Sequence, residues 1–135
     1  MNDLLAPWCQ TKWILLSSGL FMIPSFLSYY KGLYLLSGLG FLTSIVSMNY
    51  WRKCCRGWRR NLDLYLSKLM CVVKLYYFII YATKWTQYIN YSIICSFAFI
   101  SYLMANQNIK YWYLFHILFH IIIVYCGIKI IKLIY

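Results

Sequence analysis

Acidic residues are nearly absent from this sequence, which contains two Asp and no Glu among 135 residues. With Asp3 and Asp63 as the only acids, we expect no chemistry built on a close pair of carboxylates. Charged residues of either sign make up only 11%, whereas 64% of residues are hydrophobic. A soluble domain needs about 25% charged residues. The chain therefore lacks the polar surface of a soluble protein, and it is too apolar to be disordered.

The six cysteines also lack the regular spacing of a zinc finger or of a disulfide framework. Most of them fall within apolar stretches, so we expect reduced thiols. No linker, low-complexity tract or internal repeat divides the sequence, which favours one integral membrane domain. The first apolar run has neither a basic region before it nor a small-residue cleavage pattern after it. We expect it to remain as a helix and not to be cleaved as a signal peptide.

Five apolar stretches approach the 20 residues or so that cross a bilayer as a helix. Their expected ranges are 13–30, 32–50, 61–82, 88–105 and 111–128. The third range is extended back to Asn61, a suitable N-cap, which places Asp63 where the helix dipole favours a negative charge. Pro24 is expected to kink the first helix. The predicted fold class is all-α, a polytopic transmembrane bundle of about five helices.

Basic residues outnumber acidic ones by 13 to 2, and five of them crowd into the segment 51–60 between two apolar runs. Those five are Arg52, Lys53, Arg56, Arg59 and Arg60. With Trp51 and Trp58 beside them they indicate a loop at the membrane interface, which favours anionic lipid headgroups as partners and disfavours nucleic acid. Cys54 and Cys55 in this loop are either sites of S-palmitoylation or incidental thiols.

The distribution of basic residues between the helix ends predicts the orientation in the membrane. Seven lie on the side of this loop, at positions 12, 52, 53, 56, 59, 60 and 110, and four on the other side, at 31, 84, 129 and 132. Loops that stay in the cytoplasm carry the excess of Lys and Arg. The N-terminus and the loop 51–60 are therefore expected in the cytoplasm.

Polar residues recur at helical spacing within the apolar stretches. Positions 37, 40, 44, 47 and 51 share one face of the second helix, which is either a packing seam of small residues or a functional face. On the third helix Asp63 and Lys74 share a face with Ser67. Asp63 either complements the helix N-terminus, pairs with a nearby arginine of the loop, or belongs to a site. Lys74 either extends toward the interface or lines a polar interior.

His116 and His120 are the only histidines and lie four residues apart. On a helix this spacing places both imidazoles on one side, where they can bind one Zn²⁺ or hydrogen-bond to other helices without metal. At 1.5 Å per residue they lie roughly 8 and 14 Å from the start of their helix, while Ser47 and Asp63 lie about 5 Å from the same ends of theirs. We therefore expect these four residues in one leaflet.

The pattern of Ser47, Trp51, Asp63 and the late His-x-x-x-His at His116 and His120 resembles the CREST superfamily. That superfamily includes alkaline ceramidases and the progestin and adiponectin receptors, seven-helix proteins with a zinc-dependent lipid amide hydrolase core. The resemblance implies that the two histidines ligate zinc, that Asp63 holds the zinc-bound water and that Ser47 supports the site. The chain departs from the family in having five predicted helices and in carrying Trp51 where the family has its third histidine.

Two function classes follow. The first is a non-enzymatic multi-pass membrane protein, or a degenerate CREST-like core, that organises a membrane, anchors a partner or conducts ions past Lys74. The second is a divergent zinc-dependent lipid amide or ester hydrolase that uses His116, His120 and Asp63. Richness in Ile, Tyr, Phe, Asn and Lys with only four Ala is typical of an AT-rich genome, such as that of a large DNA virus or an intracellular microbe.

Overall fold

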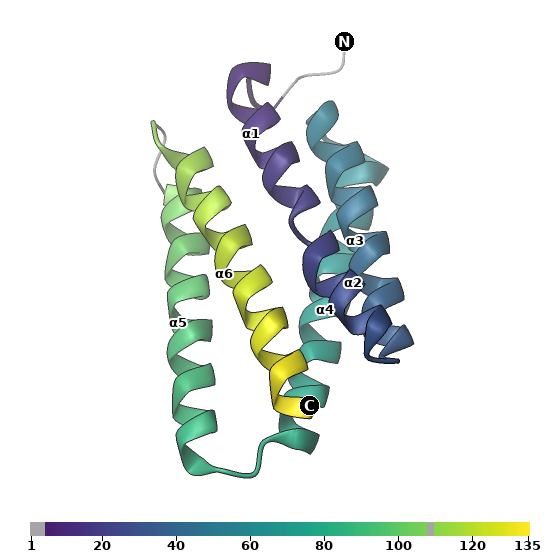
Figure 1. Cartoon of the computed structure of the whole chain (residues 1–135). Helices are drawn as coiled ribbons and strands as arrows, with labels where there is room; N and C mark the ends of the chain where they lie inside the picture. The colour runs from purple at the N-terminus through teal and green to yellow at the C-terminus, as the bar shows by residue number, and fades with distance from the viewer. Residues whose placement is uncertain (1–4, 108–109) are drawn as a thin grey trace.

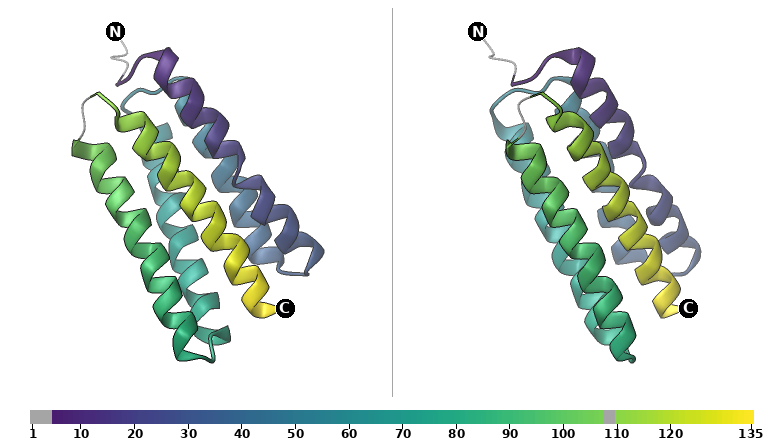
Figure 2. Two further views of the ribbon diagram at one scale, coloured as in Figure 1. Left: turned by 60° about the vertical axis from the view of Figure 1, so that its left-hand side comes forward. Right: turned by 90° about the vertical axis from the view of Figure 1, so that its left-hand side faces the viewer.

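The apolar stretches of the sequence form helices. The computed structural model describes residues 5–107 and 110–135. Figures 1 and 2 show these helices running back and forth along one common direction. In chain order they are α1 (Trp8–Gly19), α2 (Met22–Tyr30), α3 (Tyr34–Arg52), α4 (Trp58–Tyr81), α5 (Trp85–Gln107) and α6 (Trp112–Ile134). Each of the five predicted ranges coincides with a helical segment, which confirms the all-α class. Most helices extend a few residues beyond the predicted bounds.

The first predicted helix is broken into α1 and α2, which continue in nearly the same direction (Figure 1). At the break the amide of Leu20 donates to the carbonyl of Ser17, and the amide of Ile23 donates to that of Leu20, a tighter 3₁₀-type pattern. Pro24 follows within the first turn of α2. Proline has no amide hydrogen for the carbonyl four residues earlier, which is that of Leu20, and its ring crowds that carbonyl. The predicted kink therefore lies one turn before Pro24.

The start of α4 differs from the prediction. The helix begins at Trp58, and the residue before it, Gly57, has a φ of 147°. Only glycine adopts such a conformation readily, which lets the chain reverse sharply after α3. Asn61 lies in the first turn of α4, where its amide bonds to the carbonyl of Gly57, so the prediction that Asn61 caps the helix was wrong.

Two helices, α3 and α6, organise the bundle. Helix α3 packs against α1, α2 and α4, and α6 packs against α1, α2, α4 and α5. Helix α5 lies at the edge of the bundle beside α6 (Figures 1 and 2). The beginning of α1, the end of α3 and the beginning of α6 meet at one end of the bundle. There Ile14, Tyr50, Trp51 and Cys54 form a buried apolar cluster. This end carries the loop 51–60.

Within the described part of the chain, four helical segments are long and apolar enough to cross a membrane: Trp8–Tyr30, Trp58–Tyr81, Trp85–Gln107 and Trp112–Ile134. Helix α3 does not meet the same measure of apolar character. Its hydroxyl and glycine positions face inward, since Ser37, Gly40, Ser44 and Ser47 are all buried. The predicted face of α3 is thus confirmed, and its polar groups are covered by neighbouring helices.

Candidate functional site

The histidine pair lies on α6 at the end of the bundle that carries the loop 51–60. The two imidazole centroids are 4.7 Å apart, as the four-residue spacing predicts. His120 is buried, with 3% of its surface exposed, and the ring of Phe21 at the α1–α2 break stands 4.9 Å from it. His116 is partly buried and faces α3. Both imidazoles therefore belong to the interior of the bundle.

Ser17 connects α1 to this pair. Its hydroxyl oxygen lies 2.8 Å from Nδ1 of His120, and the same hydroxyl donates to the carbonyl of Ile14 at 2.9 Å. A hydroxyl carries one hydrogen, so with that hydrogen on the Ile14 carbonyl the second bond needs a proton on Nδ1 of His120. The Nε2 atom of His120 is then its remaining acceptor.

Ser18 connects α1 to α3. Its hydroxyl lies 3.1 Å from the hydroxyl of Ser47, and its carbonyl accepts a hydrogen bond of 2.8 Å from Ser44. Ser47 in turn interacts with the carboxyl of Asp63 on α4. Neighbouring serines of α1 thus bind different helices: Ser17 reaches the histidines and Ser18 reaches Ser47. We call the set of Ser17, Ser18, Ser47, Asp63, His116 and His120 the polar core.

Asp63 is the least satisfied member of the polar core. It is 7% exposed, and its Oδ1 atom has no hydrogen-bond partner among residues 5–107 and 110–135. Burial and a hydrogen bond with Ser47 are the main influences on its carboxyl group. Pairing with Arg59 or Arg60, one of the three alternatives for Asp63, is not seen among the described residues. A buried carboxylate oxygen without a partner is unusual in proteins and marks either a bound water or a functional position.

Trp51 stands where the CREST pattern has its third histidine. The indole packs at 5.0 Å against the ring of His116, edge to face, and at 6.0 Å against Trp112. Its Nε1 is buried without a partner in the described part of the chain. An indole N–H is a donor only and offers no lone pair to a metal. Trp51 therefore fills the space beside His116 without supplying a ligand.

The donor set does not match a zinc centre as the structure describes it. Across the two described ranges, no group of three or more His, Cys, Asp or Glu side chains lies close enough together to hold a metal ion. A zinc site uses at least three protein ligands. The structure therefore brings Ser47 and Asp63 together, and His116 and His120 together, with the two pairs joined through the α1 serines. It does not assemble the carboxylate and both imidazoles into one ligand set.

Ser17 and Ser18 are the site residues that the sequence interpretation did not identify. The sequence pattern that could have identified them is a pair of adjacent hydroxyls within the apolar stretch 13–30. Each hydroxyl there must find a hydrogen-bond partner away from water. The break between α1 and α2 follows directly after them. The partners of these serines depend on how α1 is rotated against α3 and α6, which no periodicity within α1 reveals.

Lys74 forms a second buried polar position, nearer the other end of α4. It is 4% exposed, and its ammonium donates to the carbonyl of Ile123 on α6 at 3.2 Å. Gly127 lies beside it, and the tightest neighbour of a Cβ atom there would be the Cβ of Pro24 at 3.2 Å, so Gly127 lets α2 approach α6 next to the lysine. Lys74 therefore points between α4 and α6 and does not extend toward the interface.

The loop 51–60 presents its positive charge outward. Arg52, Lys53, Arg56 and Arg60 are exposed, and Arg59 is partly buried. The two cysteines of the loop differ: Cys54 is 3% exposed and its thiol donates to the hydroxyl of Tyr50, whereas Cys55 is more accessible. Burial raises the pKa of the Cys54 thiol. Cys55 is thus the more accessible of the two thiols, and the choice between S-palmitoylation and an incidental thiol stays open.

The fold and the apolar helices define the class of the protein: it is a multi-pass integral membrane protein built as a helical bundle. Comparison with protein-family models, with curated proteins and with solved structures found no match to the chain. The CREST resemblance therefore stays a prediction from a few positions.

Proposed function

We propose that this is a non-enzymatic multi-pass membrane protein in which a degenerate CREST-like core holds the helices together. The observation that carries the proposal is the packing of Trp51 against His116, 5.0 Å between ring centroids. The position of a third ligand is filled by an indole, and the second imidazole is engaged by Ser17. Both histidines then act as hydrogen-bonding and packing groups in the interior of a scaffold that organises a membrane or anchors a partner.

The energetics favour this role for the polar core. In hydrocarbon, helices gain little from apolar contact alone, and hydrogen bonds between helices contribute about 0.6 kcal/mol on average and up to about 2 kcal/mol. The bonds of Ser17, Ser18 and Ser44 join α1 to both α6 and α3. Such a network fixes the position of the short helix α1, which is interrupted after Gly19.

The proposal includes an orientation. We place five crossings in the membrane, with α3 counted as a crossing because it lies along the other helices and buries its serines (Figure 1). The loop 51–60 then faces the cytoplasm and binds anionic lipid headgroups. A glycosylation acceptor inserted after Arg56 should remain unmodified in a eukaryotic microsome, while one inserted after Thr83 should be modified. The reverse pattern would show the opposite orientation.

Metal content tests the central claim. The protein purified in detergent without chelators should contain much less than one zinc per chain by elemental analysis. A variant with His116→Ala and His120→Ala should have the same low content and a lower melting temperature. One zinc per chain, lost in the double variant, would overturn the proposal.

The competing function is a divergent zinc-dependent hydrolase of lipid amides or esters that uses His116, His120 and Asp63, with Ser47 in support. The observation that favours it is the unpartnered Oδ1 of buried Asp63 in the polar core. Zinc lowers the pKa of bound water and polarises a carbonyl when it is held in such a site. This function predicts stoichiometric zinc together with amide hydrolysis that Asp63→Asn abolishes while zinc stays bound.

A further inference from the structure

A pocket of about 430 Å³ lies between α4, α5 and α6, near the ends of α4 and α6 and the start of α5. The pocket therefore lies far from the polar core along the helices, near the end of the bundle opposite to the loop 51–60. Three helices contribute to it, including Phe78 of α4, Asn90 of α5 and Lys129 of α6. Its volume falls in the range of small-molecule binding sites.

The polar residues of this pocket include three that carry N–H donors, which are Lys129, Gln87 and Asn90, together with the hydroxyls of Tyr91 and Tyr125. Lys129 is exposed, and its ammonium stands 5.4 Å from the ring centroid of Tyr125, which also lines the pocket. Gln87 accepts two hydrogen bonds of 2.9 Å at its Oε1 atom, from the amides of Thr83 and Lys84. That orientation leaves the amide hydrogens of Gln87 for a ligand. Asn90 adds a second amide.

No acidic side chain of residues 5–107 or 110–135 lines the pocket, so none of these residues neutralises the lysine. Among the described residues the one acid is Asp63, which interacts with Ser47 in the polar core. A cation and two amide groups without a carboxylate are suited to a phosphate, which accepts several hydrogen bonds and carries negative charge.

The remaining wall of the pocket is apolar, with Ile94 of α5 and Ile130 and Leu133 of α6. Asn90 lies five residues after the start of α5 at Trp85, or about 8 Å along the helix. That is the depth at which the headgroup region gives way to acyl chains. The pocket thus combines phosphate-binding groups with an apolar wall at the membrane interface.

We propose that this pocket binds one anionic phospholipid. Its phosphate contacts Lys129, Gln87 and Asn90, and the upper part of an acyl chain lies along Ile94 and Leu133. The site is separate from the lipid contacts of the loop 51–60, which lie at the other end of the bundle. A basic residue near the membrane surface contributes enough to change lipid affinity roughly fivefold.

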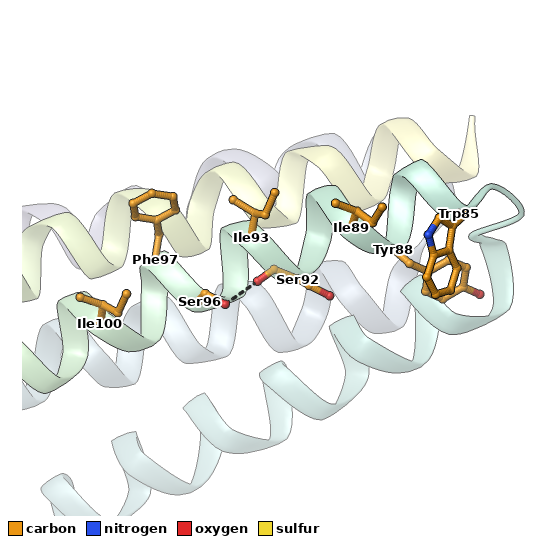
Figure 3. Close-up of a pocket in the computed structure, with 8 residues that line it drawn as sticks. All are labelled: Trp85, Tyr88, Ile89, Ser92, Ile93, Ser96, Phe97 and Ile100. Carbon is orange, nitrogen blue, oxygen red and sulfur yellow. Dashed lines mark hydrogen bonds between the residues drawn. The ribbon is translucent and has the colours of Figure 1, made fainter.

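A larger pocket of about 510 Å³ does not qualify as a site (Figure 3). All the side chains that line it belong to α5, from Trp85 at one end to Ile100 at the other. Its polar groups are the hydroxyls of Ser92, Ser96 and Tyr88 and the indole N–H of Trp85, and the hydroxyl of Ser96 donates back to the carbonyl of Ser92. With no charged group, this face of α5 has the character of a surface covered by acyl chains.

Native mass spectrometry of the whole protein tests the proposal. The protein is incorporated into bilayers of equal phosphatidylglycerol and phosphatidylcholine with identical acyl chains, and the lipids retained after release are counted. One phosphatidylglycerol should be retained in preference to phosphatidylcholine. Lys129→Gln should reduce this preference roughly fivefold. The matched control is Lys132→Gln, an exposed lysine on the same helix that does not line the pocket, and it should retain the preference.

Several outcomes would overturn the proposal. These are equal retention of both lipids by the unmodified protein, equal loss in both lysine variants, and no retained lipid at all. Excess inorganic phosphate should leave the lipid bound. Displacement of the lipid by inorganic phosphate would mean that the site binds a free anion. Ile94→Trp fills the apolar wall and should reduce retention of the lipid, while gel filtration of each variant checks that the bundle is intact. Unchanged retention in Ile94→Trp would exclude the acyl-chain part of the site.

Discussion

The serine hydroxyls of α1 contact other helices, whereas those of α5 bond within their own helix. Ser17 and Ser101 are equally buried, each with 5% of its surface exposed. The hydroxyl of Ser17 reaches His120 on another helix, whereas that of Ser101 donates to the carbonyl of Phe97 within α5. Ser96 likewise donates to Ser92 of its own helix. Each of these hydroxyls donates to a carbonyl of its own helix, but the hydroxyl of Ser17 also contacts His120 and so joins α1 to α6, whereas the bonds of Ser101 and Ser96 stay within α5.

The close approach of α2 to α3 is the feature of the bundle whose stability a substitution should lower most. A Cβ atom on Gly40 would stand 2.1 Å from the hydroxyl oxygen of Ser25 and 3.2 Å from its Cβ. Gly40→Val should therefore lower the free energy of unfolding by about 3 kcal/mol, because the two helices must separate. Thermal unfolding in detergent measures the effect. Gly38→Val is the control, since Gly38 has no atom within 4 Å of such a Cβ. Equal losses in both variants would refute the role of close packing.

The serine comparison itself can be tested directly. Ser17→Ala should lower the free energy of unfolding by about 1 kcal/mol, because it removes a hydrogen bond between helices. Ser101→Ala should change it by less than about 0.5 kcal/mol, because only a bond within α5 is lost. Both are measured by thermal unfolding under the same conditions. A larger loss for Ser101→Ala would reverse the interpretation of the two regions.

Lys74 gives a smaller expected effect. Replacing a buried polar group by an apolar one of similar size is often nearly neutral, so Lys74→Leu should change stability by less than about 1 kcal/mol. The ammonium is bonded to the carbonyl of Ile123 between α4 and α6, so we expect no contribution of Lys74 to ion passage. Ion flux into liposomes should be the same for the unmodified protein and the variant. Flux that disappears in Lys74→Leu would support an ion-conducting role instead.

The two cysteines of the basic loop should differ in reactivity with no effect on stability. The thiol of Cys54 is buried and its pKa is raised, so less of the reactive thiolate is present near neutral pH. Cys55 should be alkylated by a maleimide at least about tenfold faster, because it is the more accessible of the two. Peptide mapping by mass spectrometry after short exposure measures this ratio. Unfolding in denaturant should abolish the difference, and equal rates in the folded protein would contradict the burial of Cys54.

The prediction from sequence was most successful where it used helical periodicity. The spacing of Ser37, Gly40, Ser44, Ser47 and Trp51 correctly identified the buried face of α3. The depth argument predicted that Ser47, Asp63, His116 and His120 share one leaflet. The structure brings Ser47 to Asp63 and connects Ser47 to the histidines through the serines of α1, while the leaflet itself stays a prediction. The predicted helix start at Asn61 was wrong, because the chain reversal at Gly57 allows α4 to begin at Trp58, before its apolar run.

The sequence by itself determined the helical membrane class, the faces of the helices and the proximity of His116 to His120, because these are local properties of composition and helical spacing. Only the tertiary structure decided that Ser17 bonds to His120, that Trp51 stands against His116 and that Asp63 is separate from the histidines. These contacts depend on the rotation of each helix about its axis and on the break before Pro24. Packing among several helices sets that rotation, so no single helix encodes it.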